Sequence, residues 1–347
     1  MTDSMAAPQD ETELEERLSR PTPGSIEAMG RLEGDLLILG AGGKMGPSLA
    51  RMARRAADAA GRTEQRVVAV SRFSDPRLRG ELERERIATI ACDLFDPRQR
   101  AALPPASDVI WMVGQKFGTG LPGSYWATNT FLAGALAEQC AGARIVAFST
   151  GNVYAPTPRD AAAPRESTPV APLGEYAMSC WGRERVLQYM SHRHGTPTLI
   201  LRLNYAVEMR YGVLVDLASR LLRGESISLA VPEVNLVWQG YANAVAIESL
   251  ARATSPAEVL NVTGPARHRV RDLATALAAR LGVDAHFIDP EGTSSLLSDA
   301  SACCERFGEP LPDTQTLLDW TAAWLTAGGR TLDRPTKFDV TDGDYAG

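Results

Sequence analysis

Short apolar runs alternate with helical stretches from residue 35 to residue 202, and this alternation constrains the fold more than any other feature of the chain. The runs are nearly continuous in valine, isoleucine, leucine and alanine, which is typical of parallel strands that helices cover on both faces. Right-handed crossovers then predict an α/β fold with a doubly wound parallel sheet. The predicted strands are 35–39, 66–70, 87–91, 108–113, 144–149 and 198–202. The predicted helices between them are 45–60, 75–85, 99–102, 125–141 and 176–192.

Outside this alternation the pattern is weaker. The first residues are polar and acidic, and we expect two short helices there, one over 10–20 and one opened by Pro23, either packed on the body or frayed. After residue 205 apolar residues keep only helical spacing, around 270–281 and 317–325. The expected segments are an N-terminal arm at 1–33, the doubly wound domain at 34–204, a smaller, mainly helical substrate region at 205–330 that is partly interleaved with the sheet, and an exposed polar tail at 331–347.

The charge balance and the cysteines exclude several classes of protein. Lysine and arginine number 36 against 42 acidic residues, a net charge of −6, which argues against nucleic acid or an anionic membrane surface as the main partner. No apolar run reaches the length of a membrane span, and the first residues lack the basic start and apolar core of a signal peptide. The five cysteines have no Cys-x-x-Cys spacing and no nearby histidine, which predicts reduced thiols in a cytoplasmic protein without a metal site.

A glycine-rich loop joins the first predicted strand to the first predicted helix. The strand runs into Gly-Ala-Gly-Gly-Lys-Met-Gly, a Gly-x-x-Gly-x-x-Gly pattern. Glycine there permits a tight turn, lets the backbone approach a pyrophosphate and packs the helix close to the strand. The start of the helix adds unpaired N–H groups and a partial positive charge. The loop therefore predicts dinucleotide binding through Gly40, Gly42, Gly43, Lys44, Met45 and Gly46.

Ser71 and Arg72 end the second predicted strand, where the ribose of a bound dinucleotide would lie. A carboxylate at this point would hold the 2′-hydroxyl of NAD, whereas an arginine accommodates the 2′-phosphate of NADP. The sequence therefore predicts NADP as the preferred cofactor, with NAD as the alternative and Lys44 as a candidate second cation. An Arg72 that only solvates a surface turn is the competing interpretation. Asp93, after the third strand, is placed to accept a hydrogen bond from the adenine amino group.

Several further motifs occur together in the order seen in one known family. They are Asp93-Leu94, the run Ser149-Thr150-Gly151-Asn152-Val153-Tyr154 after the fifth strand, Asn129 in the preceding helix, and Tyr176 at the start of the helix that reaches Glu184. Over roughly residues 34–330 the chain resembles the extended short-chain dehydrogenase/reductase family of NAD(P)-dependent epimerases and dehydratases. The resemblance implies a Rossmann fold, action mostly on sugars and nucleotide sugars, and a homodimer built through the helices of Trp126 and Trp181.

The family's catalysis uses a serine or threonine, a tyrosine and a lysine, the last two in a Tyr-x-x-x-Lys pattern. By position Thr150 and Tyr176 match the first two, but Cys180 stands where the lysine is expected. A neutral thiol cannot lower the pKa of a phenol through its charge. Three hypotheses stay open. Lys116 or an arginine replaces the lysine, or other acid–base groups act while Thr150 and Tyr176 polarise the substrate, or the protein binds NAD(P) without efficient turnover.

The resemblance also implies contacts to the substrate and the reaction type. Gly151 and Asn152 follow Thr150 where the family's dehydratases have an acidic pair, which disfavours 4,6-dehydration. Asn204 and Tyr205 are expected to line the substrate cleft. We predict an NAD(P)-dependent oxidoreductase or epimerase acting on a secondary alcohol or ketone of a sugar, nucleotide sugar or polyol; the alternative is an NAD(P)-binding sensor or regulatory protein on the same fold. The remaining expected cofactor contacts are Leu94, Val113, Gly114, Lys116, Asn129, Tyr176 and Asn204.

Overall fold

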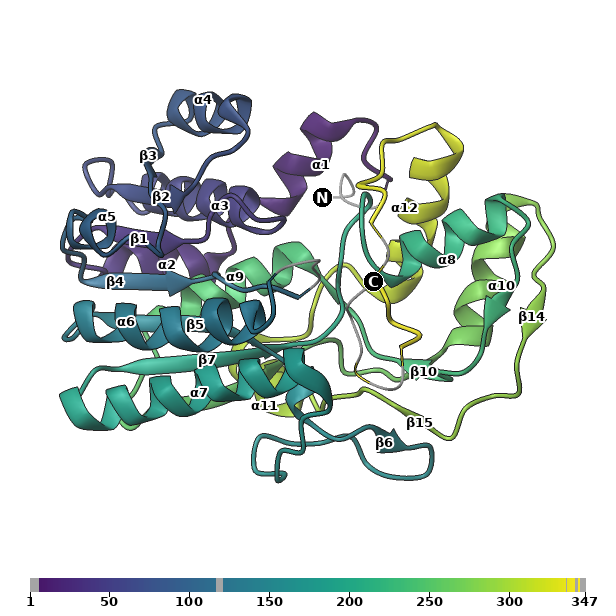
Figure 1. The fold of residues 1–347 in the computed structure, drawn as a ribbon. Helices are drawn as coiled ribbons and strands as arrows, with labels where there is room; N and C mark the ends of the chain where they lie inside the picture. Colours follow the sequence, from purple (N-terminus) through teal and green to yellow (C-terminus); the bar gives the residue numbers. More distant parts are fainter. Residues whose placement is uncertain (1–5, 117–120, 335, 341–342, 344–347) are drawn as a thin grey trace.

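A seven-stranded parallel sheet forms the centre of the protein, as Figure 1 shows. The computed structural model describes residues 6–116, 121–334, 336–340 and 343. Its strands lie in the order β12-β7-β5-β4-β1-β2-β3, with every neighbouring pair parallel. The chain order reverses between β1 and β4, so the prediction of a doubly wound sheet is confirmed. The strands are β1 (Leu36–Leu39), β2 (Val67–Ser71), β3 (Ala88–Ala91), β4 (Asp108–Trp111), β5 (Arg144–Thr150), β7 (Thr198–Leu203) and β12 (Glu258–Val262).

Helices cover both faces of this sheet. Alternate strand residues point to opposite faces, so Leu36 and Ile38 belong to one apolar core, while Leu37 and Leu39 belong to another. The first core packs against α3 and α9, and the second against α6 and α7. The helices are α1 (Glu11–Leu18), α2 (Pro23–Arg31), α3 (Gly46–Ala59), α4 (Pro76–Arg84), α5 (Pro97–Ala101), η1 (Trp126–Phe131), α6 (Leu132–Gln139), η2 (Gly151–Val153), α7 (Gly174–His194), α8 (Val213–Leu222), α9 (Gln239–Leu250), α10 (Val270–Leu281), α11 (Ser301–Phe307) and α12 (Thr314–Thr326).

The chain after residue 205 contributes more strand than its helical spacing suggested. It supplies the edge strand β12 to the central sheet and the buried helix α9 to one of its faces. The rest forms α8, α10, α11, α12 and several two-stranded pairs. These pairs are β6 (Thr157–Pro158) with β15 (Ser294–Ser295), β8 (Ala206–Val207) with β11 (Val237–Trp238), β9 (Ile227–Ser228) with β14 (Phe287–Ile288), and β10 (Glu233–Val234) with β13 (His268–Arg269).

The helix predicted over 125–141 is divided into two geometries. Its first part, η1, is a wide turn with π-helical hydrogen bonding, and α6 continues from it as an ordinary α-helix. Such wide turns occur frequently at functional sites, because they shift the side chains of one turn relative to the next. Here η1 carries Asn129, whose side chain is fully buried.

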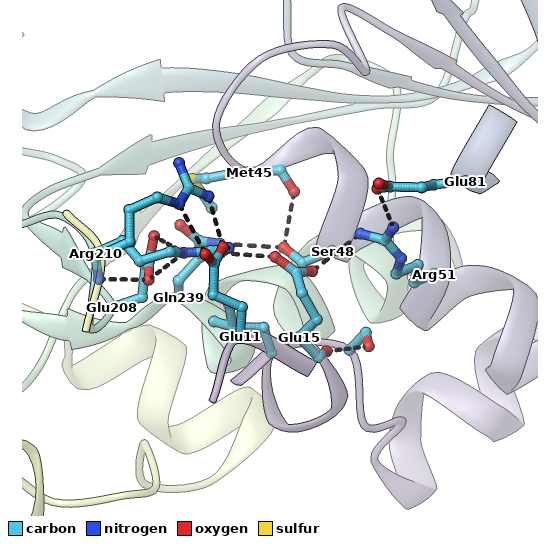
Figure 2. Close-up of polar contacts among 12 residues, drawn as sticks. Glu11, Glu15, Met45, Ser48, Arg51, Glu81, Glu208, Arg210 and Gln239 are labelled. Atoms are coloured by element: carbon cyan, nitrogen blue, oxygen red, sulfur yellow. Dashed lines mark hydrogen bonds and ion pairs between the residues drawn. The ribbon is translucent and has the colours of Figure 1, made fainter. Parts of the chain in front are cut away.

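The N-terminal arm is packed on the body. Leu14, Leu18, Met29 and Leu32 are completely buried in the main core. Figure 2 shows how Glu15 of α1 joins two distant parts of the chain. One of its carboxylate oxygens lies 3.0 Å from Nη1 of Arg51 on α3, and the other lies 2.7 Å from Nη2 of Arg210 before α8. The arm therefore ties the helix after the glycine loop to the region that follows the sheet. None of the helices in the described part of the chain has the length and apolar character needed to cross a lipid bilayer.

Part of the tail packs back onto the protein and departs from the predicted exposed extension, whereas Asp333 and Arg334 are exposed. Phe338 is only 1% exposed. The backbone N–H of Leu332 donates to the carbonyl of Arg210 at 2.9 Å, and the Thr336 hydroxyl donates to Asp216 at 2.6 Å. The burial of Phe338 could not be predicted, because a single apolar residue among polar ones has no periodicity. The rest of the predicted tail, apart from Gly343, lies outside the described residues.

We expect Glu15→Gln to lower the free energy of unfolding by about 1–2 kcal/mol, because it leaves the nearly buried Arg51 and Arg210 each without one charged partner. Urea denaturation of the full chain measures this loss. Glu16→Gln is the matched control on the same helix, since its ion pair with Arg55 is exposed and such pairs contribute about 0.5 kcal/mol or less. Equal stability of the two variants would show that the bridge contributes nothing.

Candidate functional site

The glycine loop approaches two other backbone segments closely. Gly40 has a φ of +87°, and a Cβ there would lie 2.9 Å from the backbone nitrogen of Val113. A Cβ on Gly46, at the start of α3, would lie 2.3 Å from the carbonyl oxygen of Ala41. Both positions therefore require glycine, the first for its backbone conformation and both for space. Gly43 has only an ordinary contact at 3.5 Å, and it is exposed beside the loop, where a ligand could approach its backbone.

The start of α3 is held by hydrogen bonds from α9, a helix of the C-terminal region. The Ser48 hydroxyl donates to the Met45 carbonyl at 3.0 Å, and it accepts from Gln239 of α9 at 3.1 Å (Figure 2). Asn243, one turn further along α9, also donates to Ser48, at 2.9 Å. These contacts fix the end of the glycine loop from a helix that lies far away in the sequence.

A cavity of about 1190 Å³ extends along the carboxyl ends of β1, β2 and β3. Arg72 is exposed at its edge and has no hydrogen bond or ion pair with any residue in the described ranges. The residues present fit a dinucleotide, since the loop is open to a pyrophosphate, a helix begins beside it, and a cation stands after β2. The predicted cofactor residues that line this cavity are Gly40, Gly42, Gly43, Ser71, Arg72, Asp93, Leu94, Val113, Gly114 and Lys116.

A second cavity, of about 390 Å³, adjoins the first. The two share Gly114, Lys116 and Arg334 in their walls. The predicted catalytic residues Thr150 and Tyr176 line the second cavity. The structure thus brings Lys116, Thr150 and Tyr176 together where the cavities meet. Other predicted residues in the second cavity are Lys44, Met45, Asn204 and Tyr205.

Lys44 does not lie beside Arg72, where a second cation for the 2′-phosphate was expected. Its ammonium group sits 4.0 Å from the ring centroid of Tyr211 and lines only the second of the two cavities. Burial lowers the pKa of Lys44 to about 8. Lys44 therefore lies in the cavity of Thr150 and Tyr176, whereas Arg72 lies in the other one.

Asn129 lines neither cavity, although it was predicted to contact the cofactor. Its side-chain oxygen accepts from the backbone N–H of Gln115 at 2.8 Å, and its amide donates to the Gln115 carbonyl at 3.0 Å and to Ser179 at 2.9 Å. Asn129 therefore fastens the loop after β4 to helix α7, and so fixes the backbone that carries Lys116.

Tyr176 occupies an enclosed position beside Thr150. The two side chains are hydrogen bonded, and the phenol also contacts the Cys180 thiol one turn along α7. Burial raises the pKa of Tyr176 well above its ordinary value, and interaction with Cys180 adds to this rise, although the Thr150 hydrogen bond and the Arg183 charge act in the opposite direction. Tyr176 is therefore a neutral phenol at physiological pH.

Two cations stand close to Tyr176 and Cys180. Lys116 carries a pKa lowered by burial to about 8, and Arg183 is a 5% exposed residue of α7. The Arg183 Nη1 donates to the Val113 carbonyl at 3.0 Å, while its buried Nε has no hydrogen-bond partner in the part of the chain that the structure describes. The sequence analysis did not single out Arg183. Its spacing of seven residues from Tyr176 places both on one face of α7, and this was the signal available.

Arg202 lies beneath the second cavity and not in its wall. Its Nη2 pairs with Oε2 of Glu184 at 2.7 Å, and its Nη1 donates to the Tyr154 hydroxyl at 2.7 Å. Ser149 donates to the other oxygen of Glu184 at 2.5 Å. This buried network fixes β5, β7 and α7 relative to one another and thereby positions Thr150 and Tyr176.

Comparison with known proteins agrees with this geometry. Residues 36–230 match the model of the NAD dependent epimerase/dehydratase family, which is more than half of the chain. The chain belongs to this family. The family resemblance predicted from the sequence is confirmed. No curated protein matches the chain.

Solved structures of similar fold share little sequence with the chain. A variant of UDP-glucuronic acid 4-epimerase from Bacillus cereus has 15% identity and a TM-score of 0.70, over 84% of this chain and 99% of that one. The dTDP-glucose 4,6-dehydratase from Bacillus anthracis has 13% identity and a TM-score of 0.71, over 84% and 96%. UDP-glucose 4-epimerase from Thermotoga maritima has 17% identity and a TM-score of 0.69, over 85% and 99%. At such identity these neighbours establish the fold alone.

Proposed function

We propose that the protein is an NADP-dependent oxidoreductase or epimerase that acts on a secondary alcohol or ketone of a sugar, nucleotide sugar or polyol. The observation that carries the proposal is the hydrogen-bonded pair of Thr150 and Tyr176 beside the junction of the two cavities. Family membership gives the general kind of reaction. The similar structures were solved with NAD, with UDP-glucose or with a UDP-glucuronic acid analogue, and these ligands are the guide to the type of substrate.

The large cavity would hold the cofactor, which supplies hydride chemistry when it is bound. Gly40, Gly43 and the first turn of α3 would receive the pyrophosphate. Arg72 would pair with a 2′-phosphate, and its lack of a partner among the described residues supports NADP over NAD. Asp93 and Leu94 line the part of this cavity beyond Ser71, which would receive the adenine.

Tyr176 and Thr150 would bind the oxygen of the reacting carbon. Since Tyr176 is a neutral phenol, it would donate a hydrogen bond to a substrate carbonyl and pass its proton to the oxygen as negative charge develops there. The protonated Lys116 beside it would stabilise the remaining phenolate charge. This arrangement favours the direction of reduction, because the tyrosine begins with its proton in place.

A sensor or regulatory protein on the same fold is the second candidate. It is supported by Cys180 in the lysine position and by the raised pKa of Tyr176, both of which weaken proton abstraction from an alcohol. A folded protein that binds the cofactor but reduces no sugar or polyol ketone would favour this candidate.

The exposed face of η1 and α7 supports a homodimer. Large apolar side chains gather there without cover in the single chain. Free cysteines in the described part of the chain support a cytoplasmic protein. The exposed residues on this face are Trp126, Phe131, Met178, Trp181 and Tyr189.

We expect the protein to bind NADPH at least tenfold more tightly than NADH, a difference of about 1.4 kcal/mol. Titration of cofactor-free protein, followed by quenching of tryptophan fluorescence, measures both affinities. Arg72→Gln should remove the preference by weakening NADPH binding alone, whereas Arg98→Gln, an exposed change outside both cavities, should leave it intact. A preference for NADH in the unaltered protein would contradict the role given to Arg72.

Tyr176→Phe should abolish reduction of the ketone substrate, because it removes the only proton that the tyrosine can donate. Its NADPH affinity should stay within a few-fold of that of the unaltered protein, and steady-state kinetics with fluorescence titration separate the two effects. Turnover retained in the variant would remove Tyr176 from the mechanism.

The rate of reduction should depend on the charge of Lys116. With a pKa of about 8, Lys116 is protonated below that pH and loses its charge as the pH rises through it, so kcat should be level at low pH and fall above about 8. Lys116→Arg keeps the charge and should shift the fall to higher pH, whereas Lys116→Met should lower kcat at every pH. A pH profile that is the same in the unaltered protein and in Lys116→Arg would assign the fall to another group.

A further inference from the structure

The second cavity has an unusual charge for a site expected to take a neutral sugar. Lys44, Lys116 and Arg334 all line it, and no acidic residue does so within the part of the chain that the structure describes. The chain has only three lysines, Lys44, Lys116 and Lys337, and each of them lines one or both of the cavities. The cleft therefore concentrates positive charge in a protein whose net charge is −6.

Lys44 and Arg334 both line this cavity, and both act on Tyr211. Lys44 lies 4.0 Å from the centroid of the Tyr211 ring. Arg334 is close enough for its charge to lower the pKa of Tyr211, which burial otherwise raises to about 12. Neither cation forms an ion pair with a residue in the described ranges. The charges of Lys116 and Arg210 already lower the pKa of Lys44, and an anion bound beside Lys44 would relieve this repulsion.

Two acidic groups act on this end of the cavity, Asp216 on Tyr211 and Glu208 on Lys44, and each pairs with an arginine. The Glu208 carboxylate favours the protonated form of Lys44, but it lies outside the cavity wall and both of its oxygens accept from Nε of Arg210 at 3.2 Å. Arg210 in turn is held by Glu15 and Glu11 of the N-terminal arm. Figure 2 shows this group of ion pairs around Arg210. The protein thus satisfies Arg210 and leaves Lys44 and Arg334 available to a ligand.

The tail limits how large that ligand can be. Leu332, Arg334 and Thr336 form part of the wall of the second cavity. They are fastened by the Leu332 contact to Arg210, by the Thr336 contact to Asp216 and by the buried ring of Phe338. The volume of this half-open cavity is about 390 Å³, against about 1190 Å³ in the cavity that fits a dinucleotide. A nucleotide sugar carries a nucleoside and two phosphates beyond its sugar, and so needs a space nearer to the larger value.

We propose that the substrate is a compact anion, a hydroxy or keto compound of monosaccharide size with a carboxylate or phosphate, and that Lys44 and Arg334 bind this anionic group while Thr150 and Tyr176 face the reacting carbon. This inference rests on the proposed function and narrows its substrate from sugars, nucleotide sugars and polyols to acidic compounds that are not linked to a nucleotide.

A matched set of probes on one sugar scaffold tests the proposal. Glucuronate, glucose 6-phosphate, glucose and UDP-glucuronate are each titrated by calorimetry into the NADPH-saturated protein, where a reduced cofactor and an alcohol cannot react. The expected result is binding of glucuronate or glucose 6-phosphate at least tenfold tighter than binding of glucose. The stronger of the two anions identifies the carboxylate or the phosphate as the recognised group.

Variants of the two cations test the assignment of residues. Lys44→Met and Arg334→Met should each weaken the preferred anion at least tenfold, with NADPH affinity within threefold of that of the unaltered protein. Arg98→Gln is the control, because this exposed arginine lies outside both cavities. Thermal unfolding of every variant verifies that a loss of binding is not a loss of folding.

Each contrary result overturns a stated part of the proposal. If glucose binds as tightly as the anions, the substrate need not be charged. If UDP-glucuronate binds as tightly as glucuronate, the substrate need not be of monosaccharide size. An equal loss of NADPH affinity in the variants assigns the cations to the cofactor. Absence of binding by both anions at millimolar concentration rejects the proposal, while tight NADPH binding in the same samples leaves the proposed cofactor role standing. Loss of NADPH binding itself would instead reject the proposed function.

Discussion

The close approach of the glycine loop to the chain after β4 is the constraint on which the rest of the site depends. Gly40 lies against the backbone of Val113, so no side chain can separate the two walls of the cofactor cavity. The same segment continues to Lys116, and its backbone is held by the Asn129 amide and by Arg183 through the Val113 carbonyl. The segment from Val113 to Lys116 therefore fixes the position of the glycine loop relative to Lys116, the cation beside Tyr176.

The sheet could be predicted because its signal is local, whereas several other elements could not. Each predicted strand lies within a few residues of β1, β2, β3, β4, β5 or β7, since continuous apolar runs mark parallel strands buried on both faces. Helix α9 is buried on every side and has no amphipathic period, and β12 lies in a region where only helical spacing stood out. The return of the tail depends on Phe338 and on ion pairs such as Arg220 with Asp339, which link residues far apart in sequence.

Within the candidate site, too, some residue positions could be predicted from the sequence and others could not. The glycine loop, Arg72, Thr150 and Tyr176 were predicted from motifs beside predicted strands and helices, and the structure places them around the two cavities. The direction of a side chain is a tertiary property, and so Lys44 was expected at the ribose and instead lies over Tyr211. Asn129 was assigned to the cofactor for a similar reason, although its amide is fully used in holding Gln115 and Ser179.

The cysteine at position 180 is consistent with this distribution of charge. The charges of Arg183 and Lys116 both act on the buried Cys180 thiol, so a lysine there would add a third cation to an enclosed space that already holds two. Like charges at such separation disfavour one another's protonated forms, and burial alone has already lowered the pKa of Lys116 to about 8. A small neutral side chain avoids this repulsion. The positive charge then stays on Lys116, in the loop after β4, and on Arg183, one turn beyond Cys180 on α7. The departure from the family pattern is therefore compatible with the proposed reaction as well as with the binding protein that is its alternative, because Lys116 and Arg183 supply positive charge from other positions.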